Sequence, residues 1–390
     1  MNQRDMAEIK RRLNPEKRNP TIIHGCYATH DGRIITTFTK DVYSMPQDEN
    51  EKYMAIFKKV LSGTHGQNLL PIDFTYDQVI DSDEHRLLTA LRSTQLKDED
   101  AVETFWLRMV EYLKAEHEAT VQSIDDEQKM GNYLILLMHD GYDVPFRDGN
   151  DETDAERSDS VFSYILCGVC PVKQTKSVLS YYAARGEFIS RALDWVVSAP
   201  DMGFLFPAFE DRCANVFGAL YYTRESANVH PGFVDAVFHA ELPMPAQEQK
   251  ETFQAILQDA LGDECSMDVV QAVHETVSEK IRAQKSDKKA EPLHMTREDV
   301  REVLEDCGVS KERADAFTER YTETFGAFAQ LPAVNMVSPR QFKVETPGVS
   351  IRVDPEHSAL IQTRVIDGRP YILVPAEGGV EVNGVSVKIE

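Results

Sequence analysis

The segment YLILLMH (residues 133–139) opens the part of the sequence that decides the fold. Three further apolar runs of strand length follow it: VFSYILCGVCPV (161–172), GFLFPAF (203–209) and NVFGALYYT (215–223). The four runs are nearly continuous in apolar residues rather than alternating, which is typical of sheet strands covered on both faces. The short connection between the third and fourth runs predicts antiparallel neighbours. We therefore expect a central mixed or antiparallel sheet covered by helices.

The residues before this sheet region predict a hairpin followed by helices. Asp31-Gly32 is a pair that readily adopts the positive φ values of a tight turn, so residues 22–38 are expected to form a β-hairpin around it. Apolar residues at three- and four-residue spacing predict helices over residues 49–61 and 102–113. A short strand is expected between them, at residues 69–74.

The rest of the chain predicts loops, helices and turns. The polar segment 146–160 is expected to be a solvated loop, and the segment 184–200 a helix that covers the sheet. Helical spacing predicts two more helices between residues 253 and 281. Residues 296–299 read Thr-Arg-Glu-Asp, a capping-box pattern that predicts the start of another helix. Gly-containing turn pairs recur in roughly the last 55 residues and predict short strands there.

These patterns place the chain in the α+β class. The polar, Lys-rich segment 283–292 is the best candidate for a linker. The expected regions are an N-terminal α+β region (1–130), a central α/β sheet region with trailing helices (131–285), a helical hairpin (293–335) and a small β-rich C-terminal module (336–390).

The charge of the chain is large and unevenly distributed. It has 42 Lys and Arg against 65 Asp and Glu, a net charge of −23, and residues 41–160 carry −16 of it, from 27 acidic against 11 basic residues. The first 20 residues are net +3 and predict a short amphipathic helix whose polar face carries Lys10, Arg11 and Arg12. An acidic field repels phosphate backbones and anionic lipid headgroups. We therefore expect no membrane binding, and nucleic-acid binding only through residues 1–19.

The composition indicates a cytoplasmic location. The N-terminus lacks the apolar core of a secretory signal, and the longest apolar run (133–138) is far shorter than the roughly 20 residues that span a bilayer. The six cysteines are scattered without framework spacing, which suits a reducing compartment with free thiols.

Cys167 and Cys170 form a Cys-x-x-Cys motif. Such a pair is a redox dithiol or half of a zinc site when it stands at a helix N-terminus or beside a second pair. Here it lies inside an apolar strand-like run, and strand residues three apart point to opposite faces. No second pair completes a tetrahedral site. We interpret the two cysteines as small buried residues, with redox activity left open.

Acidic residues follow the first and third apolar runs. Loops at strand ends converge at the edge of a sheet, where carboxylates serve as an acid–base pair or hold a divalent ion. If the first and third strands are neighbours, Asp140, Asp143, Glu210 and Asp211 lie close together. Otherwise they are simply the polar residues that follow each strand. The candidates are Asp140, Asp143, Glu210, Asp211 and Arg212 for catalysis and, of these, Asp140, Glu210 and Asp211 for metal binding, with His139 nearby.

Three other motifs favour structural interpretations. The acidic segment 148–154 resembles a calcium loop but lacks its required glycine. Residues 63–68, GTHGQN, predict a helix-capping turn, because no Lys follows the glycines as a phosphate loop requires. The helical pair 296–326 resembles a helix-turn-helix in outline, yet its second helix has acids matching its bases, which favours a packing hairpin.

Several phrases of the sequence resemble a bacterial family catalogued as a domain of unknown function, number 4317 in that series. The resemblance covers essentially the whole chain and implies a bacterial, cytosolic protein. It implies no activity and no site residues. The phrases are IFKKVLSGTHGQNLL (56–70), GNYLILLMHDGYDVP (131–145), YILCGVCPV (164–172), DWVVSAPDMGFLFPAFEDR (194–212) and VIDGRPYILVPAEGGVEVNGV (365–385).

The function is unknown from the sequence, and we expect a non-catalytic binding or regulatory protein with a protein partner or a second copy of itself. This expectation rests on several modules without a recognised catalytic or cofactor signature. The first alternative is a metal-assisted hydrolase or nuclease that uses the carboxylates at the strand ends. A second is a ribosome- or nucleic-acid-associated factor that uses the basic first helix. No cofactor is expected, apart from the divalent ion of the first alternative.

Overall fold

The structure, a computed structural model, describes residues 1, 3–16, 22–121, 131–147, 153–174, 179–190, 195–210, 212–242, 244–286, 293–376, 379–382 and 384–387. It divides into two compact units, unit 1 (Met1–Pro245) and unit 2 (Ala246–Glu390). Each unit is described by itself.

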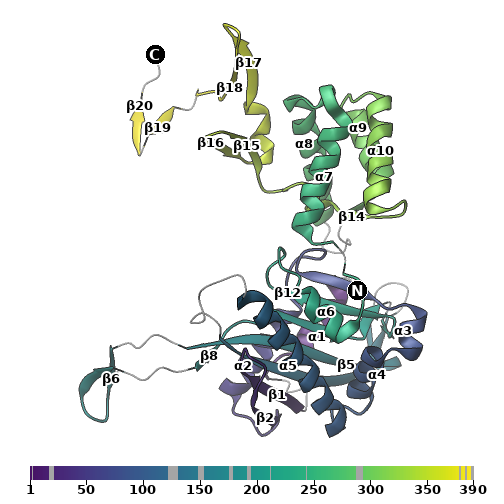
Figure 1. The fold of residues 1–390 in the computed structure, drawn as a ribbon, viewed down its shortest axis with the longest axis vertical. Coiled ribbons are helices and arrows are strands. Elements are labelled where there is room, and N and C mark those ends of the chain that lie inside the picture. Colours follow the sequence, from purple (N-terminus) through teal and green to yellow (C-terminus); the bar gives the residue numbers. More distant parts are fainter. Residues whose placement is uncertain are drawn as a thin grey trace. The chain divides into compact units, whose positions relative to one another are not determined.

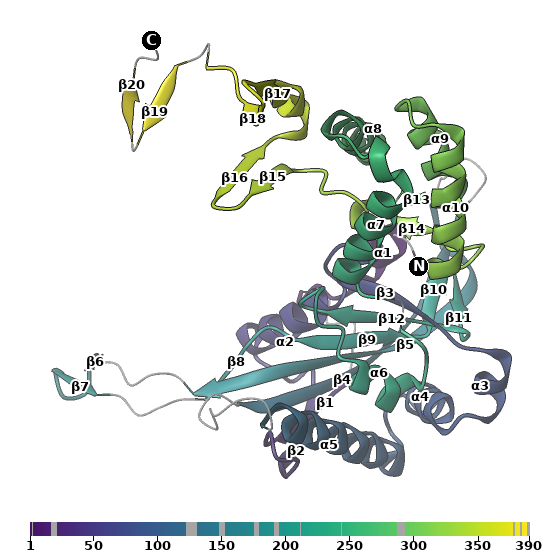
Figure 2. The same cartoon turned by 45° about the horizontal axis from the view of Figure 1, so that its top comes forward.

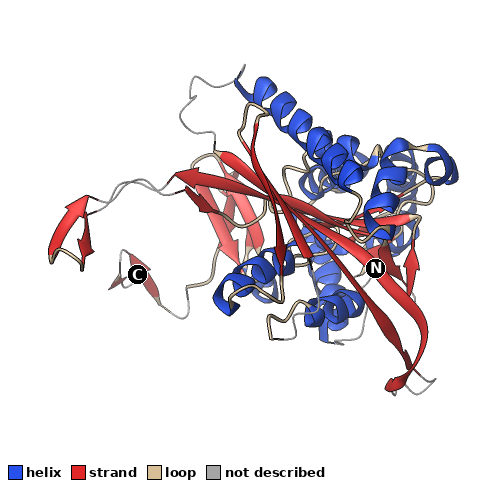
Figure 3. Cartoon of the chain, turned by 90° about the horizontal axis from the view of Figure 1, so that it is seen from below, coloured by secondary structure: helices blue, strands red, loops and turns tan. Residues whose placement is uncertain are grey.

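An eight-stranded sheet forms the centre of unit 1 (Figure 1), and its twist is visible in Figure 3, where strands are red. Neighbouring strands in it are antiparallel, including β9 and β12, whose pairing was predicted from their short connection. The order across the sheet is β2 (Ile34–Asp41), β1 (Ile22–Ala28), β4 (Asn132–Arg147), β5 (Thr153–Gln174), β9 (Met202–Phe206), β12 (Gly218–Thr223) and β3 (Leu69–Asp73), with β8 (Trp195–Val197) also paired to β5.

Both faces of this sheet are covered, which explains the continuous apolar runs. In β4, Leu134, Leu136 and Met138 belong to the apolar core on one face, whereas Ile135 and Leu137 belong to the core on the other. Adjacent strand residues point to opposite faces, so a strand buried on both sides requires an apolar residue at every position. The α+β class with a large antiparallel sheet is thereby confirmed.

Two sets of helices provide the covers (Figure 2). We call the two faces of the sheet the α1–α2 face and the α4–α6 face, after the helices whose apolar residues complete each core. The helices of unit 1 are α1 (Gln3–Arg12), α2 (Gln47–Val60), α3 (Tyr76–Asp81), α4 (Asp83–Ser93), α5 (Glu99–Val121) and α6 (Pro231–Phe238).

Gly203 allows α2 to lie close to the sheet. A Cβ atom at this position would lie 2.4 Å from the carbonyl oxygen of Cys167 and 2.9 Å from a methyl group of Val60 in α2. Both distances are shorter than van der Waals contact, and one partner is backbone, which cannot rotate away. A residue without a side chain is therefore required at this crossing.

Two of the expected elements differ from the structure. The predicted covering helix 184–200 is wrong, because β7 (Glu187–Ser190) and β8 lie there, and three consecutive β-forming residues in β8 favour a strand. The predicted loop 146–160 is also wrong at both ends, because β4 and β5 continue as a long hairpin to Arg147 and from Thr153. Residues 148–152, and with them most of the calcium-like loop, lie outside the described residues.

The structure also divides the chain differently from the predicted regions. The predicted boundary after residue 130 lies inside unit 1, because β1 pairs with β4 and β3 pairs with β12. The helices expected to trail the sheet region belong to unit 2 instead. Local patterns reveal single elements, but long-range strand pairing decides which elements share a core, and no local pattern encodes that pairing.

Four helices pack around one apolar core in unit 2. They are α7 (Ala246–Leu261), α8 (Met267–Ser286), α9 (Arg297–Asp306) and α10 (Lys311–Phe325). The strand pair β13 (His294–Met295) and β14 (Leu331–Pro332) closes the end of this bundle. No helix in the described part of either unit is long and apolar enough to cross a membrane.

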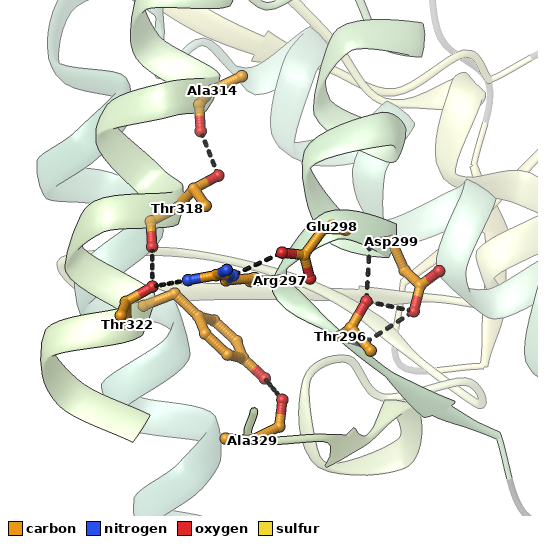
Figure 4. Close-up of polar contacts among 9 residues, drawn as sticks. Thr296, Arg297, Glu298, Asp299, Ala314, Thr318, Thr322 and Ala329 are labelled. Carbon is orange, nitrogen blue, oxygen red and sulfur yellow. Dashed lines mark hydrogen bonds and ion pairs between the residues drawn. The ribbon is translucent and has the colours of Figure 1, made fainter. Parts of the chain in front are cut away.

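The predicted capping box at the start of α9 is confirmed (Figure 4). The backbone N–H of Asp299 donates to the hydroxyl of Thr296 at 3.1 Å, and the backbone N–H of Thr296 donates to the Asp299 carboxylate at 2.7 Å. Beside the cap, the Arg297 guanidinium donates to the hydroxyl of Thr322 in α10 at 2.7 Å. The start of α9 is thus fixed both internally and to its neighbour.

The C-terminal residues that the structure describes form three separate two-stranded hairpins rather than one sheet. Gly348, Gly368 and Gly384 have positive φ values at the turns, as the predicted turn pairs require. The hairpins are β15 (Phe342–Thr346) with β16 (Val349–Val353), β17 (Gln362–Ile366) with β18 (Arg369–Leu373), and β19 (Val380–Val382) with β20 (Val385–Val387).

Candidate functional site

Asp140, the first candidate ligand, lies on β4 on the α1–α2 face and is only 3% exposed. Its two carboxylate oxygens accept four hydrogen bonds. The Arg12 guanidinium donates two of them, at 2.6 and 2.9 Å, and the Tyr164 hydroxyl and the backbone N–H of Gly141 donate the others, each at 2.9 Å. Two carboxylate oxygens offer about four acceptor sites, so protein donors occupy all of them.

Arg12 and Glu8, one turn apart on α1, continue this network. The Arg12 guanidinium stacks on the ring of Tyr142 at 4.2 Å from its centroid. The hydroxyl of Tyr142 donates to one oxygen of Glu8 at 3.0 Å, and the guanidinium of Arg212 donates to the other at 3.1 Å. The polar residues of α1 therefore bind both β4 and the segment that follows β10 (Ala208–Glu210).

Glu210, at the end of β10, also contacts the N-terminal segment. One of its oxygens pairs with the Met1 amino group at 3.0 Å, and the other accepts from the side-chain amide of Asn215 at 2.7 Å in β11 (Cys213–Asn215). We call the contacts of residues 1–12 with Asp140, Tyr142, Glu210 and Arg212, together with the hydrogen bond from Tyr164 to Asp140, the α1 seam.

Asp143 and His139 do not join the α1 seam. Asp143 is exposed on β4, and Asp211 lies outside the described residues. His139 points to the opposite face from Asp140, where its Nε2 lies 2.9 Å from the hydroxyl oxygen of Ser163. The premise that the first and third apolar strands are neighbours is wrong, because β5 lies between β4 and β9.

Asp140 and Glu210 are therefore each bound to residues 1–12 rather than to one another. No group of three or more His, Cys, Asp or Glu residues with metal-binding geometry occurs among the described residues. The groups that donate hydrogen bonds to Asp140 are a guanidinium cation, a phenol and a backbone amide. All of them stabilise the ionised carboxylate as an ion-pair partner. The chemistry of this seam is that of a closed helix-docking contact.

The α1 seam shifts the pKa values of several of its groups. For Arg12, burial acts to lower the pKa, but the hydrogen bonds and charge of Asp140 outweigh it and raise the pKa. Burial raises the pKa of Tyr164 well above its ordinary value, and the Asp140 charge adds to this effect. For Glu210, burial acts to raise the pKa, but the hydrogen bonds from the Met1 amino group and Asn215 lower it overall. The guanidinium, the phenol and the carboxylate are thus held in the protonation states that the contacts require.

Cys167 and Cys170 lie in β5 on opposite faces of the sheet, as predicted. Cys167 belongs to the core of the α4–α6 face and Cys170 to that of the α1–α2 face. Burial raises the pKa of Cys170 to about 12 and raises that of Cys167 as well. Because the thiolate is the reactive form, both positions favour the interpretation as buried apolar residues.

Tyr142, Tyr164 and Glu8 are seam residues that the sequence analysis missed. Tyr164 is a hydroxyl-bearing residue within an otherwise apolar run, and a fully buried phenol normally has a hydrogen-bond partner. A hydroxyl group at this position of the apolar run therefore indicated a polar partner inside the core. The basic face of the first helix was recognised, but its partner in the same chain was not.

A second surface of unit 1 has the opposite character. The strands β6 (Leu179–Tyr182) and β7 form a two-stranded sheet of their own, which we call the arm hairpin (residues 179–190). Leu179, Tyr181 and Phe188 are 73%, 60% and 67% exposed, and the rings of Tyr181 and Phe188 lie 5.4 Å apart in paired positions. Large apolar side chains thus face solvent together on one short hairpin.

Comparison with known proteins gives one match. The model of a family described as Domain of unknown function (DUF4317) matches residues 1–385. No curated protein and no solved structure matches the chain. The family predicted from the sequence is confirmed, and its description states no activity.

Proposed function

We propose that this chain, which belongs to the DUF4317 family, is a non-catalytic binding or regulatory protein that contacts another protein through the arm hairpin. The observation that carries the proposal is the exposure of Leu179, Tyr181 and Phe188 on this hairpin. Apolar side chains that are exposed together, rather than singly, are characteristic of protein-interaction surfaces.

The energetics of a hairpin support this function. An isolated two-stranded hairpin is at best marginally stable in water, and in the described residues the arm hairpin pairs with no third strand. Burying one large apolar side chain contributes about 1.5–3 kcal/mol. A partner that covers Tyr181 and Phe188 would therefore stabilise the hairpin and gain affinity from the same contact.

The charge of the chain favours a different protein over a second copy as this partner. Two copies carrying −23 each repel one another once their surfaces come within about a Debye length, roughly 8 Å. A partner with a neutral or basic rim around an apolar contact surface experiences no such repulsion. If contacts between two copies outweigh this charge repulsion, the partner is a second copy and the protein is a homo-oligomer.

The proposal is tested with a photo-crosslinking amino acid placed at position 181 of the full chain in its native cells. We expect one discrete crosslinked protein, identified by mass spectrometry, and its loss when Phe188→Ser is added. The matched control carries the same crosslinker at Tyr76, which is 68% exposed on α3. Equal crosslinking from positions 76 and 181, or none from position 181, would contradict the proposal, and light scattering identifies a self-crosslink as a homo-oligomer.

A further inference from the structure

The C-terminal ends of α1 and α2 border a surface hollow of about 490 Å³. Its lining residues are Lys10, Arg11 and Asn14 from α1 and the turn after it, and Lys58 from α2. The hollow lies on the solvent side of α1, since Met6, Ile9 and Leu13 on the other side of the helix are buried in the core. It is therefore distinct from the α1 seam.

Three cations meet in this hollow without a carboxylate among the lining residues. Within the described part of the chain, no ion pair joins Lys10, Arg11 or Lys58 to an acidic residue, although the protein has 65 Asp and Glu. The Nε of Arg11 donates to the carbonyl of Ala7 at 3.2 Å, which leaves its terminal nitrogens as donors. In an acidic protein, unneutralised cations gathered in one hollow require an explanation.

Asn14 adds a neutral donor to these charges. Its side-chain oxygen accepts the backbone N–H of Glu16 at 3.2 Å, which fixes the carbonyl side of the amide. The NH₂ group of the same amide is then the side that is open to a ligand. Lys10 is half-buried, and burial lowers the pKa of its ammonium, a cost that a bound anion would offset.

The dipoles of the two helices do not account for this arrangement. Cations in the last turn of a helix are favoured by its C-terminal partial charge, and the last turn of α2 carries Lys58 and Lys59 alike. Lys59 is exposed and does not line the hollow. The dipole explains why α2 ends in lysines, but it does not explain why one of them converges with Lys10 and Arg11.

We propose that this hollow binds a small molecule that carries a chain of phosphate groups, either free polyphosphate or a nucleoside triphosphate. Lys10, Arg11 and Lys58 would contact phosphate oxygens, and the Asn14 amide would donate one hydrogen bond. Three cations match the multiple charge of a phosphate chain better than the single charge of a carboxylate.

The same charges argue against a nucleic acid as the ligand. A polynucleotide needs a continuous basic track along the surface, whereas residues 41–160, which include α2, carry a net charge of −16. A compact phosphate chain needs only the hollow itself. Its binding would also join α1 to α2, so the ligand would stabilise the docked position of α1 by mass action.

The test is calorimetric titration of the full chain, at an ionic strength of about 0.15 M where the Debye length is about 8 Å, with sodium tripolyphosphate, ATP, adenosine and a single-stranded oligonucleotide. We expect tripolyphosphate and ATP to bind and adenosine not to bind. Lys58→Gln should weaken tripolyphosphate binding about tenfold or more, because it removes a charge-assisted hydrogen bond. Lys59→Gln is the matched control: it changes the net charge equally on the next residue of α2 and should leave the affinity within about twofold.

Each outcome decides the proposal. Equal affinities for tripolyphosphate and ATP would assign recognition to the phosphate chain alone, and tighter ATP binding would add a nucleoside contact. The proposal is overturned if none of the phosphate probes binds, if Lys58→Gln and Lys59→Gln weaken binding equally, or if the oligonucleotide binds more tightly than both phosphate compounds. Arg11→Gln replaces Lys58→Gln if circular dichroism shows that the latter is unfolded, and Phe188→Ser should leave phosphate binding unchanged.

Discussion

The α1 seam and the arm hairpin use their residues in opposite ways. In the seam, charged and hydroxyl side chains of the kind expected in an active site are paired within the chain, as Asp140 is with Arg12 and Tyr164. In the arm hairpin, aromatic side chains of the kind expected in a core are exposed, as Tyr181 and Phe188 are. The type of a residue therefore does not show whether it stabilises the fold or binds a partner. The groups that its side chain contacts in the folded chain do show this.

Of the substitutions in these two regions and the core, the removal of Asp140 should lower the free energy of unfolding most. Asp140→Ala leaves the partly buried Arg12 and the buried Tyr164 without their acceptor, and deleting one member of a buried pair costs about 3 kcal/mol or more. Chemical denaturation of the full chain measures the loss. Asp143→Ala, three residues away on the same strand and exposed, should change the free energy of unfolding by less than about 0.5 kcal/mol. Equal effects of the two substitutions would contradict the seam.

The glycine at the crossing of α2 and the sheet should give the next largest effect. Gly203→Ala places a Cβ 2.4 Å from the Cys167 carbonyl oxygen, and overpacking of this kind costs about 1–3 kcal/mol. The melting temperature should fall accordingly. Gly141→Ala is the control, because its added Cβ would meet no atom closer than 3.8 Å. An unchanged melting temperature in Gly203→Ala would show that α2 does not lie this close to the sheet.

Buried histidines should make the stability of unit 1 depend on pH. Burial lowers the pKa values of His139 and His230 below those of the unfolded chain. The unfolded state then binds more protons as the pH falls from about 7 to about 5, so this contribution to stability is present above pH 6.5 or so and is lost toward the lower, folded-state pKa.

Denaturation at a series of pH values measures this dependence, and His139→Gln should make it shallower. His239→Gln serves as the control, because the His239 side chain is 68% exposed. A dependence that both substitutions reduce to the same extent would argue against burial of His139 as its cause.

Divalent ions should have the smallest effect. Because protein donors occupy the oxygens of Asp140, we expect Mg²⁺ and Mn²⁺ to leave the melting temperature unchanged. A ligand that binds only the folded state must raise it. A rise that Glu210→Ala and Asp211→Ala both abolish would favour the metal-assisted hydrolase or nuclease predicted from the carboxylates.

Local sequence patterns predicted what depends on neighbouring residues. The apolar run of β4 predicted a strand covered on both faces, and the three-residue spacing of Cys167 and Cys170 predicted that they lie on opposite faces. The apolar residues of the segment 184–200 also fit helical spacing and so predicted a helix, but the pairing of β7 with β6 and of β8 with β5 overrides that spacing.

The sequence predicted the two sides of the candidate site separately, but it did not predict that they contact each other. The basic first helix and the acidic strand ends were both recognised, but Arg12 and Asp140 are 128 residues apart, and Met1 and Glu210 are 209 apart. Pairings at such distances follow from the strand order, in which β5 separates β4 from β9. The sequence contains no local trace of that order.

The α1 seam also has a consequence for synthesis on the ribosome. The helix at residues 3–12 is made well before its partner Arg212, which follows about 200 residues later; at 5–20 residues per second this separation is a delay of roughly 10–40 s. During that interval the core that Met6, Ile9 and Leu13 enter is incomplete, because it also contains Phe209 and Leu220. The nascent helix is then an exposed amphipathic segment, and a chaperone that shields it until β4, β5 and β10 have emerged would protect the chain at its most vulnerable stage.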